Sequence, residues 1–334
     1  MDLMTGPKTK GGRGPMKTKA LTALAVVALA LVGCAKPGDG RMKVGFAQIG
    51  SESGWRAAET NTAKREAASR NIDLSIADAQ QRQENEIRAM RAFIAQRVDG
   101  ILLAPVVSTG WDGVLEEAKA AKIPVVLMDR QIQTEKPDLY LSSVAADSVH
   151  EGQIAGDWLV RKAAGKPCRV LELQGTVGAS VAIDRKKGFD EAIAKTANVR
   201  IVRTQSGDFT RSKAKEVMES FVKAEQGQPI CAVFAHNDDM MIGAIQALEE
   251  AGLKPGQSVL TISIDGVPDI FKAMVDGKAN ATVELSPNMA GPALDLLIAY
   301  KKTGKVPPKW IKTQSKLYEP DTAQAEYDRR KALY

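Results

Sequence analysis

Charged and amide side chains follow several short apolar runs of this 334-residue sequence. Asp129 and Arg130 follow one run, and Asn237 and Asp265 follow two others. Arg185 lies near the start of a helical stretch. Carboxylate, amide and guanidinium groups can each engage two hydroxyl groups at once, and hydrogen bonds to charged groups contribute about 1.5–3 kcal/mol each. These residues therefore have the chemistry of a site for a polyhydroxylated molecule.

Two aromatic residues lie close in sequence to further polar groups. Trp55 belongs to the stretch Glu52–Arg56, which follows the first apolar run, and Phe209 follows Gly207 and Asp208. The C–H face of a sugar ring is apolar and packs on flat aromatic rings. Trp55 and Phe209 are therefore candidates for stacking against a sugar.

Each of these residues also has a purely structural alternative. Asp129 and Arg130 could form a structural ion pair, and Trp55 could belong to the core, because large aromatic residues are mostly buried. Asn237 and Asp265 could cap the helices that follow them, which is a common use of such residues. Taken together, however, their shared position after apolar runs favours a cleft.

The elements that must position these residues follow a regular pattern from Met42 onward. Short apolar runs such as 44–47 and 101–104 alternate with helical stretches such as 84–96, and the same alternation restarts near Val149. This pattern predicts βαβ units, and hence an α/β protein with two similar doubly wound parallel-sheet lobes. Ligands of such sheets bind beyond the carboxyl ends of the strands, which is where the polar residues fall.

Three crossovers are expected to join the two lobes. The first lobe would comprise residues 42–143 and 286–312, and the second residues 144–285 and 313–334. The expected crossover segments are Leu139–Val144, Ala281–Leu285 and Trp310–Tyr318.

The N-terminus differs in composition from the rest of the chain. Basic residues between positions 8 and 19 precede the apolar run Ala20–Val32, as in a secretory signal peptide, so residues 1–33 are set aside from the fold. Met16 is an alternative start that would give a shorter leader. Without residues 1–33, the formal charge falls from +6 to +2. That charge gives no reason to expect a nucleic-acid partner.

The leader ends in Leu31-Val32-Gly33-Cys34, which resembles a bacterial lipobox. In a lipobox the cysteine thiol receives a diacylglyceryl group and becomes the mature N-terminus, here followed by a short tether, Ala35–Arg41. The alternative is simple cleavage after Ala30. No stretch reaches the roughly 20 apolar residues of a membrane span, so membrane contact is expected only through this lipid anchor.

The sequence contains few of the residue patterns that indicate an enzyme. It contains two histidines, His150 and His236, and lacks both a cluster of metal-ligating residues and a dinucleotide-binding fingerprint. We therefore expect no cofactor, no metal and no enzymatic activity. An enzyme acting on a bound sugar remains the alternative from a different functional class.

Two cysteines remain beyond the leader, and each precedes an apolar run. If the runs after Cys168 and Cys231 form neighbouring parallel strands, both thiols lie at the same edge of the sheet. In an oxidising compartment this position favours a disulfide. Two free buried thiols are the alternative.

Five stretches resemble the periplasmic sugar-binding proteins of the ribose/galactose type, and within that family most of all the galactofuranose-binding members that serve bacterial ABC transporters. The similarity runs from about Met42 to near the C-terminus. The stretches are GSESGWRAAE (50–59), ELQGTVGASVAIDRKKGF (172–189), SGDFTRSK (206–213), AHNDDM (235–240) and SIDGVPDI (263–270).

The resemblance implies a type I binding-protein fold with a three-crossover hinge. It also implies a monosaccharide ligand, such as galactofuranose or a related hexose or pentose, together with ABC permease subunits as partners, a monomer, and a place in the periplasm or at the outer face of the envelope. A sensor that presents the sugar to a chemoreceptor or kinase is the alternative function. Carried over by position, the ligand-binding residues are Glu52, Ser53, Gly54, Trp55, Arg56, Asp129, Arg130, Arg185, Phe209, Asn237 and Asp265.

Overall fold

The computed structural model describes residues 40–332. The predicted signal peptide, residues 1–33, and the predicted lipidation site Cys34 lie outside this range. The elements that follow belong to one unit, Arg41–Tyr334, which contains two sheets and their flanking helices.

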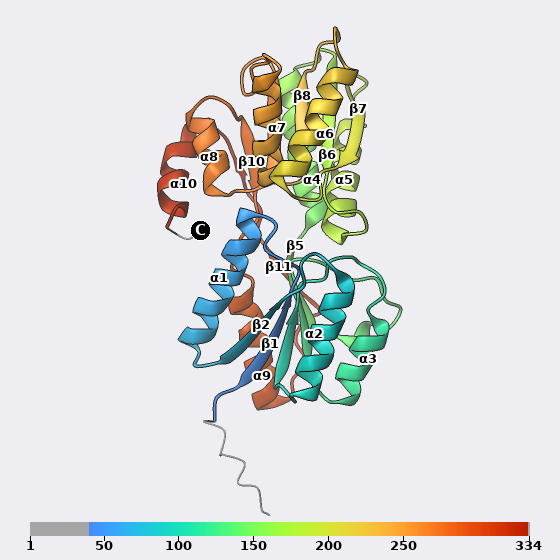
Figure 1. Ribbon diagram of the computed structural model, residues 1–334, viewed down its shortest axis with the longest axis vertical. Helices are drawn as coiled ribbons and strands as arrows, with labels where there is room; N and C mark the ends of the chain where they lie inside the picture. The colour runs from blue at the N-terminus through green and yellow to red at the C-terminus, as the bar shows by residue number, and fades with distance from the viewer. Residues whose placement is uncertain (1–39, 333–334) are drawn as a thin grey trace, which may run out of the picture. The chain divides into compact units, whose positions relative to one another are not determined.

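The first lobe is built on a six-stranded sheet in which every neighbouring pair is parallel. Helices cover both of its faces (Figure 1). In spatial order the strands are β11 (Trp310–Thr313), β5 (Ser142–Ala146), β4 (Val125–Met128), β3 (Gly100–Leu103), β1 (Lys43–Gln48) and β2 (Asp73–Asp78). The helices are α1 (Gly54–Ser69), α2 (Gln83–Ala95), α3 (Asp112–Ala120) and α9 (Ala290–Thr303).

The second lobe repeats this plan, with one antiparallel pair at the edge of its sheet. In spatial order the strands are β12 (Leu317–Tyr318), β10 (Ala281–Glu284), β9 (Leu260–Asp265), β8 (Ala232–Ala235), β6 (Cys168–Gln174) and β7 (Val199–Ser206). The helices are α4 (Ser148–Ala163), α5 (Ser180–Ile193), α6 (Arg211–Ala224), α7 (Asp238–Glu250), α8 (Pro268–Val275) and α10 (Ala323–Arg330). The predicted pair of doubly wound lobes is therefore confirmed.

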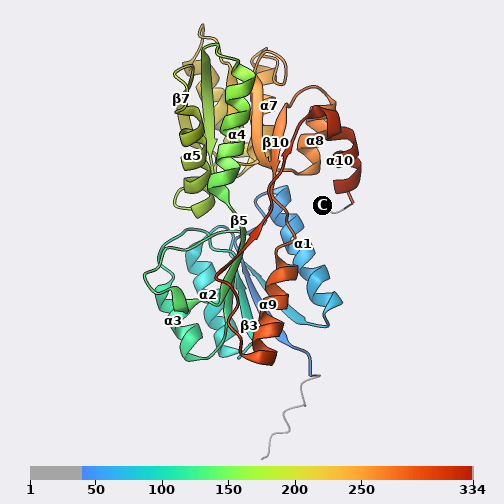
Figure 2. The same cartoon turned by 180° about the vertical axis from the view of Figure 1, so that it is seen from behind.

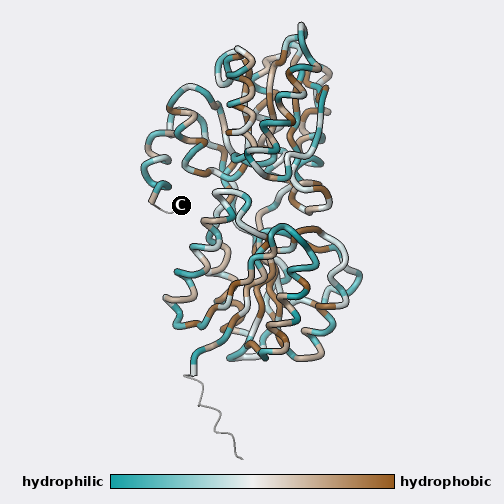
Figure 3. The backbone as a smooth tube through the Cα atoms, viewed as in Figure 1, coloured by the Kyte–Doolittle hydropathy of each residue, from teal (hydrophilic) through white to brown (hydrophobic). Residues whose placement is uncertain are grey.

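The strands are buried on both faces, which explains why they are apolar throughout. In β3, Ile101 packs with the core under α2 and α3, whereas its neighbour Leu102 packs with the core under α1 and α9. This alternation follows from the two-residue period of a strand. Figure 3 shows the hydrophobic residues concentrated along the strands inside each lobe.

Three connections link the lobes, after β5, β10 and β11 (Figure 2). The predicted crossover at Leu139–Val144 is wrong in part, because Ser142–Ala146 forms β5 and pairs with β4 of the first sheet. The predicted lobe boundaries after residues 143 and 312 likewise fall inside β5 and β11. The chain therefore leaves the first sheet after Ala146 and again after Thr313.

A disulfide joins Cys168 and Cys231, whose Cα atoms lie 5.0 Å apart. Cys168 begins β6 and Cys231 precedes β8, and these two strands are parallel neighbours. The predicted pairing is confirmed, and it lies at the amino-terminal edge of the second sheet.

In the part of the chain that the structure describes, no helix has both the length and the apolar character needed to cross a membrane.

Candidate ligand-binding site

A cavity between the carboxyl ends of the two sheets brings together almost all of the predicted site residues. Two apolar residues that the sequence did not indicate, Val181 and Leu285, also line it, and Gly54 is absent from the lining. The residues that line the cavity are Glu52, Ser53, Trp55, Arg56, Asp129, Arg130, Val181, Arg185, Phe209, Asn237, Asp265 and Leu285.

Three of the cavity residues have backbone φ angles in the positive range, and two of them lie at the ends of strands. Asp129 directly follows β4, and Asp265 is the last residue of β9. Both have positive φ angles, 64° and 127°, as does Phe209 with 60°. Positive φ is costly for residues other than glycine and occurs where the surrounding fold enforces it, often at functional sites.

Arg56 is the centre of an ion-pair network in the first lobe. Its Nη1 and Nη2 atoms lie 2.5 Å from Glu59 and 2.7 Å from Asp129, and its Nε lies 3.5 Å from Glu52. Burial lowers the pKa of Arg56, but the three carboxylates together raise it well above its ordinary value. The guanidinium is therefore a fixed positive charge at the cavity wall.

Arg130 is held by the backbone of a neighbouring loop. Its Nη1 donates to the carbonyl of Val106 at 2.7 Å, and the amide of Val106 donates to the buried Glu86 at 3.0 Å. Burial and the nearby Arg56 lower the pKa of Arg130 to about 10, which still leaves it charged at neutral pH. Burial raises the pKa of Glu86 to about 8, so this carboxyl is protonated at pH 7.

Arg185 supplies the positive charge of the second lobe. Its Nε pairs with Glu151 at 3.0 Å, and its Nη1 donates to the carbonyl of His236 at 2.7 Å. Its Nη2 lies 3.9 Å from Asp265, beyond hydrogen-bond distance. Burial raises the pKa of both Glu151 and Asp265, although Arg185 opposes the shift.

The purely structural roles considered for single residues, as helix caps or as part of the core, hold for Asn237 and Trp55 but not for Asp265. Asn237 does cap α7, because its side chain accepts from the amide of Met240 at 3.0 Å, yet it also lines the cavity. Asp265 does not cap α8, whose N-cap is Val267 without a side-chain bond. Trp55 is both core and cavity wall, since it is 2% exposed and its Nε1 donates to the carbonyl of Leu285 at 2.7 Å.

Phe209 reaches its position only because residue 175 has no side chain. A Cβ atom at Gly175 would lie 1.9 Å from Cζ of Phe209, far inside van der Waals contact. The ring of Phe209 faces the guanidinium of Arg130 across the two lobes, 5.1 Å from its carbon atom. The cavity thus has an aromatic wall from each lobe, Phe209 and Trp55.

Four buried polar atoms of the cavity residues have no hydrogen-bond partner among residues 40–332. They are Glu52 Oε2, Arg56 Nε, Arg130 Nε and Arg185 Nη2. Buried polar groups are almost always satisfied, and an unmet one costs about 1–3 kcal/mol. The space between the lining side chains is about 20 Å³, room for about one water molecule. A larger ligand can enter only if the lobes separate or side chains move.

Direct hydrogen bonds join the lobes around the cavity. The amide of Gly54, at the start of α1, donates to Asp239 of α7 at 2.9 Å. The amide of Gln131 donates to Ser180 at 2.9 Å. The structure therefore has a closed arrangement, and Gly54 contributes to closure and not to the lining.

No group of three or more His, Cys, Asp or Glu side chains within residues 40–332 is placed to hold a metal ion. His236 is buried behind the cavity, where its Nδ1 accepts from the amide of Gly175 at 3.3 Å and its Nε2 lies 3.3 Å from Glu172. Burial lowers the pKa of His236, which favours the neutral ring.

Two lobes that close on a polar cavity define a binding protein that encloses a small ligand. The model of the periplasmic binding protein domain matches residues 44–305, and the chain belongs to this family. The family is extracytoplasmic, and membership in it implies a sugar ligand and permease partners. It places the chain among binding proteins and not among enzymes.

Individual relatives support this placement. The chain is 64% identical to the galactofuranose-binding protein YtfQ of Escherichia coli over 293 residues, which cover 87% of this chain and 92% of that protein. A crystal structure of a galactofuranose-binding protein superposes with a TM-score of 0.87 at 64% identity, covering 87% of this chain and 99% of that one. The binding component of the arabinose ABC transporter of Shewanella sp. ANA-3, bound to arabinofuranose, gives a TM-score of 0.86 at 55% identity, with 87% and 98% covered.

Proposed function

We propose that this protein captures a monosaccharide in its furanose form, galactofuranose or a close relative, and presents it to an ABC permease. The observation that carries the proposal is the set of buried cavity atoms that make no hydrogen bond within residues 40–332. A sugar hydroxyl can accept from the N–H groups of Arg56, Arg130 and Arg185 that make no hydrogen bond, and it can donate to Glu52. Each such bond would give a hydrogen-bond partner to a buried polar atom that lacks one.

The charge of the cavity suits a neutral ligand. Its lining contains three carboxylates and three guanidinium groups, so their formal charges cancel. A phosphorylated sugar or a sugar acid would meet no excess of positive charge. The six groups are Glu52, Asp129, Asp265, Arg56, Arg130 and Arg185.

Capture would couple directly to closure, because the unmet donors come from both lobes. Arg56 and Arg130 belong to the first lobe and Arg185 to the second. A sugar that accepts from both sets makes its full complement of bonds only in the closed form, and it therefore shifts the population toward that form. For this motion we assign residues 42–146 with 286–313 to one lobe and residues 147–285 with 314–334 to the other, because β5 and β11 belong to the first sheet up to residues 146 and 313.

The ring form follows from the relatives and not from the cavity alone. The protein with 64% identity is named for galactofuranose, and the structure with 55% identity holds arabinofuranose. Both sugars have a five-membered ring. We assign the same ring form to the ligand of this chain.

We further propose that the mature protein is a monomer anchored by a diacylglyceryl group on Cys34, at the outer face of a membrane. The Leu31–Cys34 motif supports this anchor. Mass spectrometry of the protein purified from cells should give a lipid-modified N-terminal cysteine. An unmodified N-terminus at Leu31, the product of cleavage after Ala30, would contradict it.

Two deoxygenated sugars test the ring form by calorimetry. Galactose closes its five-membered ring through O4 and its six-membered ring through O5. 5-Deoxygalactose can therefore form the five-membered ring but not the six-membered one, and the reverse holds for 4-deoxygalactose. We expect heat of binding with 5-deoxygalactose and none with 4-deoxygalactose. Binding of 4-deoxygalactose alone would contradict the furanose assignment, and binding of neither sugar nor of galactose would contradict sugar capture.

A further inference from the structure

Two adjoining hollows lie at the amino-terminal edge of the first sheet, at the opposite end of the strands from the sugar cavity. One is about 430 Å³ and the other about 530 Å³ in volume, and they share Lys122, Ile123, Pro124 and Tyr300. Pro124 directly precedes β4. We call this surface the basal face.

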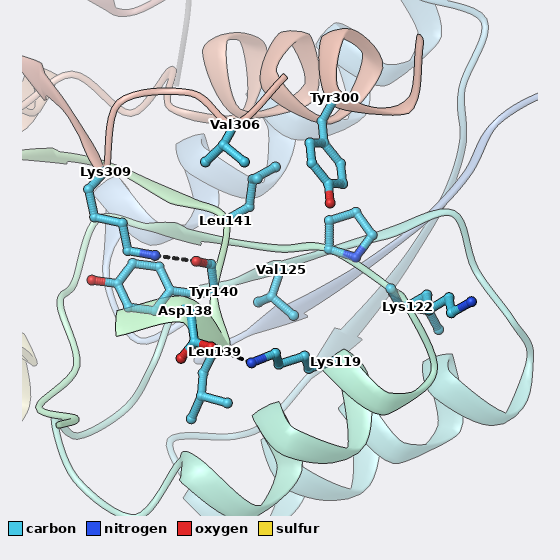
Figure 4. Close-up of a pocket in the computed structure, with 12 residues that line it drawn as sticks. Lys119, Lys122, Val125, Asp138, Leu139, Tyr140, Leu141, Tyr300, Val306 and Lys309 are labelled. Carbon is cyan, nitrogen blue, oxygen red and sulfur yellow. Dashed lines mark hydrogen bonds and ion pairs between the residues drawn. The ribbon is translucent and has the colours of Figure 1, made fainter. Parts of the chain in front are cut away.

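Cations outnumber carboxylates on the basal face by five to two. Arg97, Lys119, Lys122, Lys301 and Lys309 line it, against Asp99 and Asp138. Lys301 pairs with Asp99 and Lys119 with Asp138, which occupies both carboxylates (Figure 4 shows the second pair). Within residues 40–332, no carboxylate pairs with Arg97 or Lys122, and both are exposed.

Apolar and aromatic groups lie among these cations. Val306 is 66% exposed; the exposed Lys305 directly precedes it, and Lys309 follows three residues later. Lys309 extends over the ring of Tyr140 at 3.6 Å and donates to the carbonyl of the same residue (Figure 4). Tyr300 is half-buried beside them.

This combination fits the headgroup region of a membrane. Tyrosine is enriched at the membrane interface, and lysine extends its charged end toward phosphates while its stem stays on apolar groups. Each basic residue near an anionic bilayer contributes about 1 kcal/mol of attraction. A partner protein would need a surplus of acidic groups, whereas an anionic lipid surface supplies both the negative charge and an apolar layer for Val306.

The described chain also begins at the basal face. The amide of Lys43, the first residue of β1, donates to Asp99 of the second hollow at 2.7 Å. Six residues lie between Cys34 and Arg41, and seven fully extended steps along the chain span at most about 25 Å. A lipid on Cys34 would thus hold this edge, and not the cleft edge, close to the bilayer.

We propose that the basal face of the first lobe rests on an anionic phospholipid surface. In this contact, the amino-terminal edge of the first sheet lies on the lipid. The sugar cavity lies at the opposite ends of the strands, away from the lipid. Because this face shares no residue with the cavity, lipid contact and sugar binding use separate groups.

The test uses the mature protein as cells produce it, with an environment-sensitive dye on Val306→Cys. A second labelled protein carries the dye on Gln257→Cys, in an exposed turn of the second lobe. Vesicles of phosphatidylcholine are compared with vesicles that also contain phosphatidylglycerol. We expect a blue shift at position 306, only with phosphatidylglycerol, and its loss in about 1 M salt, where the Debye length is about 3 Å.

Variants that each remove one positive charge, on the basal face or elsewhere, distinguish binding by this face from attraction by the net charge of the protein. Lys122→Gln and Lys305→Gln should each lower the equilibrium constant for lipid contact, taken from the blue-shifted fraction of the dye, about fivefold. Lys166→Gln and Arg200→Gln, at a basic hollow of the second lobe, should leave it unchanged. Equal responses at positions 306 and 257, equal effects of both pairs of variants, or no response to phosphatidylglycerol would overturn the proposal. Calorimetry with sugar on the same variants shows separately whether sugar capture is intact.

Discussion

At the scale of single residues, each arginine of the candidate site depends on a buried carboxyl group that does not line the cavity. Glu59 holds Arg56, Glu151 holds Arg185, and Glu86 acts on Arg130 through the loop at Val106. These acids fix the direction of each guanidinium. The groups offered to a ligand are therefore oriented before it arrives, which reduces the entropy lost on binding.

Replacement of Gly175 by alanine should weaken sugar binding. The added Cβ would overlap the ring of Phe209, so the ring must move and the second-lobe wall of the cavity changes shape. We expect the calorimetric affinity to fall at least tenfold, with about 1–3 kcal/mol lost from the free energy of unfolding. Gly113→Ala in α3 is the control, since its Cβ would meet nothing within 4 Å. An unchanged affinity in Gly175→Ala would show that Phe209 does not shape the site.

Glu86 should give the protein a specific dependence of stability on pH. Burial raises its pKa from an ordinary 4.5 to about 8, so the folded protein keeps a proton that the unfolded chain releases. Its contribution to stability is complete below pH 4.5 and is lost as the pH rises through 8, by up to about 1.4 kcal/mol per pH unit.

Urea unfolding of wild type and Glu86→Gln between pH 5 and 9 measures this effect, because other titrations cancel in the difference. We expect wild type to lose stability relative to the variant up to about pH 8 and then to run parallel to it. A difference that is constant with pH would refute the raised pKa of Glu86.

At the scale of elements, α1 and α7 meet across the mouth of the cavity. Asp239 in the first turn of α7 accepts the amide of Gly54 from the first turn of α1, where helix N-termini favour a negative charge. This bond exists only in the closed form. It stabilises closure without touching the ligand.

Asp239→Ala should therefore lower sugar affinity by about tenfold, because a hydrogen bond to a charged group is lost from the closed form only. The loss should appear as faster dissociation in stopped-flow measurements. Arg211→Ala is the control, since it removes the ion pair of Asp239 within the second lobe but keeps the bond to Gly54. If both variants bind alike, the contact between the helices does not contribute to closure.

The disulfide stabilises the second lobe at the edge away from the cavity. By the loop-entropy model, a separation of 63 residues corresponds to about 4 kcal/mol. Replacing Cys168 and Cys231 together by serine should lower the free energy of unfolding by about that amount and leave sugar affinity unchanged. A folded double variant that had lost its affinity would contradict this separation of roles.

Most elements could be predicted from the sequence, because strands buried on both faces appear as short apolar runs. The sequence predicts a crossover at Leu139–Val144, which has no cluster of turn residues, whereas the structure has β5 there, with the polar Ser142 and Ser143 buried in the sheet. The helix α10 was not predicted, because its sequence AQAEYDRR is strongly polar and lacks an apolar face.

The site was predictable in part for a similar reason. Charged residues after strands are visible in the sequence, and the structure gathers them in one cavity. Val181 and Leu285 were not predicted, because an apolar residue at a cavity looks the same in sequence as one in the core. The supporting acids Glu59 and Glu151 were missed as well, since their role depends on which arginine they meet in space.

At the scale of the whole molecule, the two lobes carry complementary halves of one site. The closed arrangement leaves space for about one water molecule among groups whose hydrogen-bonding capacity is unmet. Binding and motion are thus linked, since a sugar must first find the lobes apart and then satisfies both of them when they meet.

Small-angle X-ray scattering during a titration with galactose tests this link most directly. Galactose in water includes its furanose form, so it supplies the proposed ligand. We predict that the radius of gyration falls to that of the closed form as sugar is added, with a midpoint that matches the calorimetric affinity. A calorimetrically saturated protein whose radius of gyration equals that of the sugar-free protein would contradict capture by closure.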